Sequence, residues 1–264
     1  MMKKALLVIS FGTSYAETCE KNITACEQRL AVEYPDRKLF RAFTSEMIIR
    51  KLAKRDDLHI DNPQQAFERL IAEGYQDVIV QSLHVINGDE YEKVVRQVQA
   101  SQQQFFSLRL GTPLLTTHDD FEQLITAMQS QMPELADDER VVFMGHGATH
   151  HAFSAYACLD HMLMTKKIPA MVGAVESYPE IEAIIARLQQ QNVRKVHLMP
   201  LMLVAGDHAI NDMASDEDDS WKTLIEQAGI SAQPWLQGLG ENPLIQQMFV
   251  DHLEAVLEQN EEAA

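Results

Sequence analysis

LHVINGDE at residues 83–90 returns in altered form as LMLVAGDH at residues 201–208. Two earlier blocks repeat in the same order: LLVISFGTS at 6–14 resembles VVFMGHGAT at 141–149, and RAFTS at 41–45 resembles GAVES at 173–177. Self-similarity on this scale is typical of a duplicated structural unit. We therefore expect two lobes of similar topology within the 264 residues of the chain.

Short apolar runs alternate with longer amphipathic segments in both halves of the chain. The expected strands are residues 5–10, 38–43, 78–82, 108–110, 141–144, 170–175, 196–200 and 231–234. The expected helices are residues 17–34, 63–73, 91–104, 119–132, 151–165, 178–191, 219–227 and 243–258. The strands are too apolar to have one wet face, and strand and helix alternate throughout. This pattern predicts an α/β fold of two similar lobes, each a parallel sheet flanked by helices, facing each other across a cleft.

The segment at residues 133–140 is polar, acidic and contains a proline, and it falls where the repeat restarts. We therefore predict an N-terminal lobe over residues 1–134 and a C-terminal lobe over residues 135–264, with the last helix free to pack on the first lobe. The spacing between matching blocks shrinks along the chain, which places an insertion in the first half, around residues 50–62.

The two copies differ at three positions that bear on metal binding. The first half carries Phe11, Thr44 and Glu90 where the second half carries His146, Glu176 and His208. Each position lies at or just past the carboxyl end of a predicted strand, the edge at which parallel sheets bind ligands. Two imidazoles and a carboxylate suit Co²⁺, Fe²⁺, Ni²⁺ or Zn²⁺. The sequence therefore predicts a metal site in the second lobe, although a lone histidine in a loop usually has no such role.

Other polar residues allow two interpretations. The hydroxyls around Gly12 can bind an anionic group at a helix N-terminus, or they can simply cap the helix. His84 either faces the cleft or is a buried, hydrogen-bonded histidine. The spacing of His146 and His150 could form a local metal-binding pair, but a glycine turn separates them. We therefore favour the set His146, Glu176 and His208. The residues of the first lobe that we expect to contact the substrate are Phe11, Gly12, Thr13, Ser14, His84 and Glu90.

Composition excludes several classes of partner. The formal charge of −17 argues against nucleic acid or an anionic membrane, since both require a basic face. Three cysteines without a CxxC spacing indicate neither a disulfide framework nor a thiolate metal site, and they favour a cytoplasmic protein. The apolar run after the first lysines is too short for a signal peptide, and no stretch reaches membrane-spanning length.

Four segments give the chain a resemblance to a known family. They are SFGTS at residues 10–14, GHG at 145–147, VESYP at 175–179 and MPLMLVAGDH at 199–208. These resemble the anaerobic cobaltochelatases that act on sirohydrochlorin, which are class II tetrapyrrole chelatases distantly related to ferrochelatase. The resemblance covers essentially the whole chain, with no departure at the motif positions. It implies a two-lobed chelatase fold, no organic cofactor, and a substrate metal held by His146, Glu176 and His208.

The resemblance implies insertion of Co²⁺ into sirohydrochlorin, or its reduced precursor, on the oxygen-independent route to cobalamin. Insertion requires removal of two pyrrole protons, and we expect His146, flanked by two glycines, to be the main acceptor. The substrate carboxylates require a basic rim, and the candidates for it are Arg41, Arg50, Lys51 and Lys54. The same residues could equally belong to a solvated helix face. The competing functions are an iron chelatase that makes sirohaem, with Fe²⁺ or Ni²⁺ as alternative metals, a metal-dependent hydrolase, and a metal or tetrapyrrole carrier. A homo-oligomer is compatible with the sequence.

Overall fold

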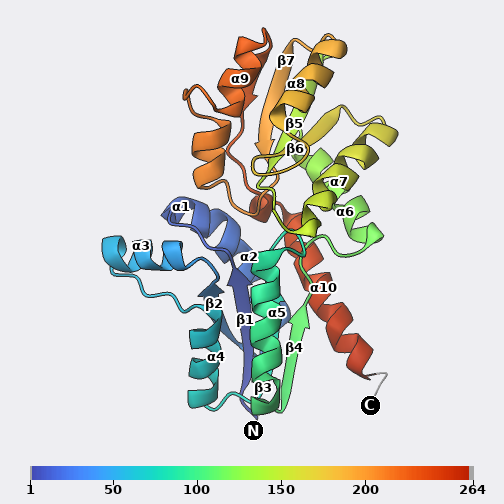
Figure 1. The fold of residues 1–264 in the computed structure, drawn as a ribbon. Coiled ribbons are helices and arrows are strands. Elements are labelled where there is room, and N and C mark those ends of the chain that lie inside the picture. Colours follow the sequence, from blue (N-terminus) through green and yellow to red (C-terminus); the bar gives the residue numbers. More distant parts are fainter. Residues whose placement is uncertain (1, 262–264) are drawn as a thin grey trace. The chain divides into compact units, whose positions relative to one another are not determined.

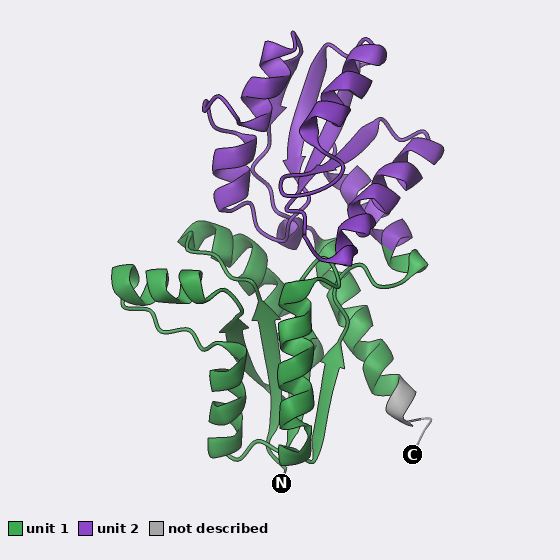
Figure 2. Ribbon diagram, viewed as in Figure 1, with its two compact units in different colours: residues 1–120, 243–264 green, residues 121–242 purple. Residues whose placement is uncertain are grey.

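The computed structural model describes residues 2–261, with side chains as far as Glu258. Contacts within the chain divide it into unit 1, Met1–Asp120 with Pro243–Ala264, and unit 2, Phe121–Asn242 (Figure 2). This division differs from the expected lobes, 1–134 and 135–264. Helix α6 (His118–Gln131) lies mainly in unit 2, where Ala127 accepts a hydrogen bond from the Asn242 side chain. The last helix, α10 (Pro243–Glu261), lies in unit 1.

Unit 1 contains one parallel sheet, whose strand order is β2-β1-β3-β4 (Figure 1). Its strands are β1 (Lys4–Ser10), β2 (Lys38–Phe43), β3 (Asp77–Ser82) and β4 (Ser107–Gly111). Its helical segments, besides α10, are α1 (Ala16–Thr18), the π-helix η1 (Cys19–Thr24), α2 (Ala25–Glu33), α3 (Glu46–Asp56), α4 (Pro63–Ala72), α5 (Asp89–Ser101) and the 3-10 turn η2 (Gln102–Gln104). Leu7, Phe67 and Val94 are buried in the core that joins the sheet to α4 and α5.

Unit 2 contains a second parallel sheet with the matching order β6-β5-β7-β8. Its strands are β5 (Glu139–Gly145), β6 (Ala170–Ala174), β7 (Lys195–Pro200) and β8 (Ser231–Pro234). Its helical segments, besides α6, are the 3-10 turn η3 (His151–Phe153), α7 (Ser154–Thr165), α8 (Ile181–Gln190), the π-helix η4 (Ala209–Met213), α9 (Trp221–Gln227) and the 3-10 turn η5 (Leu239–Glu241). Val142 and Met144 of β5 pack with Ile184 of α8 and Trp221 of α9.

The fold class is confirmed: both units are parallel α/β structures with the same strand order. The eight expected strands are present, each with ends within two residues of the prediction. Helix α3 was not expected. It lies partly within the predicted insertion, and Leu52 is its one buried residue, although Ile48, Ile49, Leu52 and Ala53 recur at helical spacing. Among residues 2–261, no helix combines the length and the apolar character needed to cross a bilayer.

Matching backbone hydrogen bonds relate the two units residue by residue. Thr44 N donates to Ser10 O, and Val175 N donates to Gly145 O, at 2.9 and 3.0 Å. Ser45 N donates to Phe11 O, as Glu176 N donates to His146 O. Position 146 therefore corresponds to Phe11, as the sequence repeat predicts, but Glu176 corresponds to Ser45. The predicted match with Thr44 was wrong by one residue, because similarity of side chains does not report the hydrogen-bond register.

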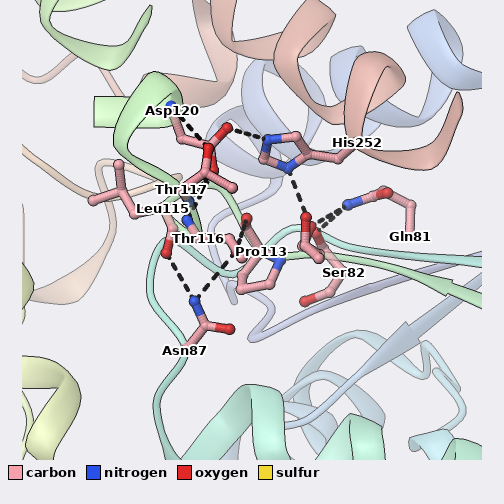
Figure 3. A network of polar contacts seen from close by, with 10 residues as sticks. Gln81, Ser82, Asn87, Pro113, Leu115, Thr116, Thr117, Asp120 and His252 are labelled. Carbon is pink, nitrogen blue, oxygen red and sulfur yellow. Dashed lines mark hydrogen bonds and ion pairs between the residues drawn. The ribbon is translucent and has the colours of Figure 1, made fainter. Parts of the chain in front are cut away.

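A polar network fastens α10 within unit 1 (Figure 3). The His252 ring lies 2.9 Å from the Asp120 carboxylate through Nε2 and 3.3 Å from the Thr112 carbonyl through Nδ1. Asp120 also accepts hydrogen bonds from the amides of Thr116 and Thr117, at 2.9 and 2.6 Å. Burial opposes ionisation of Asp120, yet these amides and the imidazole together lower the pKa of its carboxyl. The network ties the last helix to the segment that follows β4.

Candidate metal centre

The three predicted metal ligands follow three adjacent strands of the unit 2 sheet. His146 comes directly after β5, Glu176 two residues after β6, and His208 in the loop after β7. The chain leaves β5 toward β6 on one side and returns as β7 on the other. In parallel sheets, the point where the strand order reverses leaves a crevice at the carboxyl edge that suits ligands. The topology therefore explains why residues 30 or more positions apart in the sequence come together.

The side chains of His146, Glu176 and His208 offer ligand atoms that all lie within 4.8 Å of one another. The rings of the two histidines are nearly perpendicular, at 86°, with centroids 4.5 Å apart. Nδ1 of His146 lies 3.8 Å from Oε2 of Glu176. Ligand atoms bound to one metal at roughly 2.1 Å are about 3.4 Å apart, so small side-chain movements complete the site. Each side chain is between 34% and 52% exposed, which leaves room for a substrate.

The loops that carry His146 and Glu176 are held together by tight backbone packing. Gly147 has a φ of +94°, and a Cβ atom there would lie 2.9 Å from the amide nitrogens of Glu176 and Ser177. The Ser177 hydroxyl accepts a hydrogen bond from Ala148 N at 3.2 Å. Gly147 therefore lies against the neighbouring loop, because only glycine tolerates this φ and this contact.

Gly145, on the other side of His146, lies over a buried aromatic ring. A Cβ atom at Gly145 would lie 2.4 Å from Cε1 of Tyr156. Tyr156 is 3% exposed, and burial raises the pKa of its phenol to about 12. The tyrosine therefore stays protonated and supports the loop from beneath. Sequence reasoning had assigned no role to Tyr156, since an aromatic residue at helical spacing is usually part of the core.

Hydrogen bonds define which imidazole nitrogens are available to a metal. His208 Nδ1 lies 2.5 Å from Oδ2 of Asp212, and His146 Nδ1 lies 3.1 Å from the carbonyl of Gly147. A ring nitrogen that faces an acceptor carries the proton, so Nε2 of each neutral histidine keeps its lone pair. Sequence reasoning missed Asp212, although its position four residues after His208 is the spacing of neighbours on a helix.

The unit 1 residues 11–14 are divided between exposed and buried positions. Phe11 is 41% exposed, whereas Thr13 and Ser14 are 4% and 6% exposed. Gly12 has a φ of +95° and lies against the Phe43 ring. The Thr13 hydroxyl accepts a hydrogen bond from Tyr15 N at 3.3 Å, and no side chain caps α1. These hydroxyls therefore do not act as helix caps.

His84 and Glu90 lie near the carboxyl end of β3. The His84 ring is 2.8 Å from the Ser82 hydroxyl and 3.4 Å from the Thr44 hydroxyl. Burial lowers the pKa of His84 to about 4, so the ring is neutral at physiological pH. Glu90 pairs with Lys93 through Oε1, while its other oxygen is buried without a hydrogen-bond partner among the described residues. Unit 1 thus offers a neutral imidazole and a carboxylate oxygen that is free to accept.

Other predicted candidates are engaged elsewhere. His150 Nδ1 accepts a hydrogen bond from Ala152 N at 3.2 Å, and the His150 ring stacks on His151. Arg41 binds the Glu27 carboxylate through two nitrogens, so it is not part of a free basic rim. A hollow of about 430 Å³ in unit 2 is lined by residues at the amino ends of β5 and β6, and none of the three candidate ligands lines it. The candidate metal centre therefore lies at the opposite edge of the sheet from this hollow.

Two solved structures of SirB share the fold of this chain. SirB from Bacillus subtilis with Fe³⁺ matches with a TM-score of 0.65 and 14% identity, covering 99% of this chain and 98% of that one. The sirohydrochlorin chelatase SirB from Bacillus subtilis subspecies spizizenii, in complex with cobalt, matches with a TM-score of 0.63 and 15% identity over the same shares. At this identity the comparison establishes the fold.

Similarity of sequence establishes the family. The chain is 65% identical over 256 residues to the sirohydrochlorin cobaltochelatase of Salmonella typhimurium, covering 97% of both proteins. It is 34% identical over 260 residues to the sirohydrochlorin cobaltochelatase CbiKC of Nitratidesulfovibrio vulgaris, covering 97% of this chain and 92% of that protein. The family model for cobalt chelatase (CbiK) matches residues 4–258. The expected family is confirmed, and the chain belongs to the CbiK cobalt chelatases.

Proposed function

We propose that this protein inserts Co²⁺ into sirohydrochlorin or its reduced precursor, as a step of anaerobic cobalamin biosynthesis in the cytoplasm. The observation that carries the proposal is the convergence of His146, Glu176 and His208 at one sheet edge. It is supported by membership of the CbiK family and by the name of the Salmonella relative. Co²⁺ is a substrate in this reaction, and no organic cofactor is required.

The first task of the site is to hold Co²⁺ without trapping it. Two neutral imidazoles and one carboxylate supply three ligands and a single negative charge, which suits a divalent ion. All three side chains are partly exposed, so the remaining coordination positions can be taken by water and then by the macrocycle nitrogens. Exchange of ligands one at a time avoids a bare metal ion at any stage.

The second task is removal of two pyrrole protons. We assign the main acceptor role to His146, whose Nδ1 is hydrogen-bonded to a backbone carbonyl and lies 3.8 Å from Glu176. His208 is instead tied to a carboxylate, which favours a role as a lasting metal ligand. Glu176 can accept a proton in turn from His146, because the two side chains are neighbours.

Unit 1 supplies the groups that we assign to the macrocycle. Phe11, with 41% of its surface exposed, offers an aromatic face for stacking. Glu90 supplies a carboxylate whose buried, unpartnered oxygen can accept a pyrrole N–H once the side chain turns toward the substrate, and the neutral His84 adds no charge to the site. Gly12, Thr13 and Ser14 are buried, so we assign them the role of shaping the loop that carries Phe11.

The test is anaerobic incubation of the protein with sirohydrochlorin and, separately, Co²⁺, Fe²⁺ or Ni²⁺, followed by absorption spectra. We expect cobalt-sirohydrochlorin to form fastest, and to depend on His146, Glu176 and His208. Glu176→Ala and His208→Ala should weaken metal use more than tetrapyrrole binding. Faster iron insertion would favour the sirohaem reaction, and binding of macrocycle and metal without turnover would favour a carrier.

A further inference from the structure

The two candidate histidine ligands differ in what holds them. His208 Nδ1 lies 2.5 Å from the Asp212 carboxylate, whereas His146 Nδ1 lies 3.1 Å from the carbonyl of Gly147 and 3.8 Å from the Glu176 carboxylate. Among the described residues, Asp212 forms a single ion pair, and its partner is His208. Asp212 therefore belongs to no wider network of surface charges, and its side chain is directed to the metal centre.

The backbone between His208 and Asp212 is fixed by the core of unit 2. His208 directly precedes the π-helix η4, and Ile210 N donates to Gly206 O at 3.0 Å across this turn. Ala209 and Met213, at either end of η4, are fully buried in the cluster that contains Val142 and Met144. Because these neighbours are buried, the turn cannot shift without disturbing the core, and the carboxylate of Asp212 is presented to His208 at a fixed position.

Unit 1 uses the corresponding position in the same way with opposite charges. Glu90 lies eight residues beyond β3, as His208 lies eight residues beyond β7. Lys93, three residues after Glu90, pairs with its Oε1 and leaves Oε2 without a partner. In both units a charged residue about one turn later holds one end of the side chain and leaves its other polar atom available.

We propose that Asp212 is a positioning residue for metal binding, and that it fixes His208 as the stronger of the two imidazole ligands. The carboxylate accepts the Nδ1 proton, which holds the lone pair on Nε2, orients the ring and increases its donor strength. The carboxylate near Nδ1 of His146 is that of Glu176, which at 3.8 Å lies beyond hydrogen-bond distance, so His146 is the ligand freer to leave the metal and take a proton. This division of labour rests on the proposed function, whereas the effect of Asp212 on metal affinity does not.

The test is binding of Co²⁺ alone to Asp212→Ala and Asp212→Asn, measured by equilibrium dialysis and by visible absorption of the bound ion. The control is Asp218→Asn, which removes the same charge from an exposed position in the loop that follows η4. We expect Asp212→Ala to raise the Kd for Co²⁺ by about 10- to 100-fold. Asp212→Asn should give a smaller rise, because an amide oxygen can still accept the Nδ1 proton without the charge. Asp218→Asn should bind as the wild type does.

The spectrum of bound Co²⁺ separates positioning from a structural role. Loss of the hydrogen bond from His208 to Asp212 should alter the absorption bands of the bound Co²⁺ and raise KM for Co²⁺ more than it lowers kcat. A loss of stability alone would instead lower the melting temperature. If Asp212→Ala fails to fold, the isosteric Asp212→Asn carries the test. A Kd and spectrum equal to those of Asp218→Asn would overturn the proposal. If the wild type binds Co²⁺ but does not metallate sirohydrochlorin, the proposed function fails while the positioning role remains supported by the binding data.

Discussion

Replacing Gly147 by alanine tests whether the packing between the two ligand-bearing loops sets the metal site. An L-residue at a φ of +94° costs about 1–2 kcal/mol. The new Cβ atom would lie 2.9 Å from the amide nitrogens of Glu176 and Ser177, whereas ordinary contacts begin at 3.4 Å. The loops must therefore separate by about 0.5 Å, the difference between these distances. Overpacking of this kind adds about 1–3 kcal/mol, so we expect a total loss of stability of about 2–5 kcal/mol.

The same displacement should reach the chemistry, because it moves His146 and Glu176 apart. A misplacement of about 1 Å can cost roughly 100-fold in rate, so half of that distance should cost about tenfold in kcat/KM for Co²⁺. Stability is measured by urea unfolding, and activity by anaerobic cobalt insertion. Gly229→Ala is the matched control, since Gly229 has a φ of +81° and no atom within 4 Å of an added Cβ. The Gly229→Ala variant should lose only about 1–2 kcal/mol of stability, which is what the positive φ costs an L-residue, and it should keep normal activity. Equal losses in both variants, with normal cobalt insertion in Gly147→Ala, would refute the reasoning.

Three further outcomes are expected. His146→Ala should reduce cobalt insertion by orders of magnitude while sirohydrochlorin still binds, as judged by single-turnover rates and fluorescence titration, and near-normal insertion would move the base to another residue. His84 has a folded-state pKa of about 4 against 6.5 in the unfolded chain, so its contribution to stability is full above pH 6.5 and falls as the pH drops toward 4, by at most about 3 kcal/mol. Urea unfolding at pH 7.5 and 5.5 should show a smaller pH effect in His84→Gln, and an unchanged effect would contradict this assignment. Reversing the charges of Lys51 and Lys54 on α3, neither of which pairs with a carboxylate among the described residues, should weaken sirohydrochlorin binding at low salt, whereas Lys167→Glu, in unit 2, should not.

The strands could be predicted because each depends on local sequence, and the internal repeat pointed to His146, Glu176 and His208, which the structure brings together at one sheet edge. Buried parallel strands are continuous apolar runs, so β1 and β5 were recognisable without any knowledge of their partners. The internal repeat then placed Phe11 opposite His146, and the matching hydrogen bonds bear this out. A difference between two otherwise similar halves was thus informative where one half alone would have shown only a loop histidine.

The features that escaped prediction depend on contacts between distant or dissimilar residues. The hydrogen bond from Glu176 N to His146 O defines its counterpart as Ser45, which shares no property with a metal ligand. The place of α6 in unit 2 depends on contacts such as the one between Asn242 and Ala127, which are 115 positions apart. Asp212 was overlooked because an aspartate in an acidic loop usually faces solvent. In each case both residues are in the sequence, but the contact that gives them a role forms only in the folded chain.

The shared backbone of the two units explains how their side chains came to differ without cost to the fold. His146 and Phe11 both follow a central strand, and their carbonyls accept equivalent hydrogen bonds from Glu176 and Ser45. Those bonds involve main-chain atoms, so the side chains at the four positions can change while the ladder stays intact. The positions also lie past the strand ends, where substitution does not open a cavity in the core. A duplicated sheet edge of this kind allows one unit to specialise in holding a metal ion, while the other keeps an aromatic ring, a neutral histidine and a carboxylate.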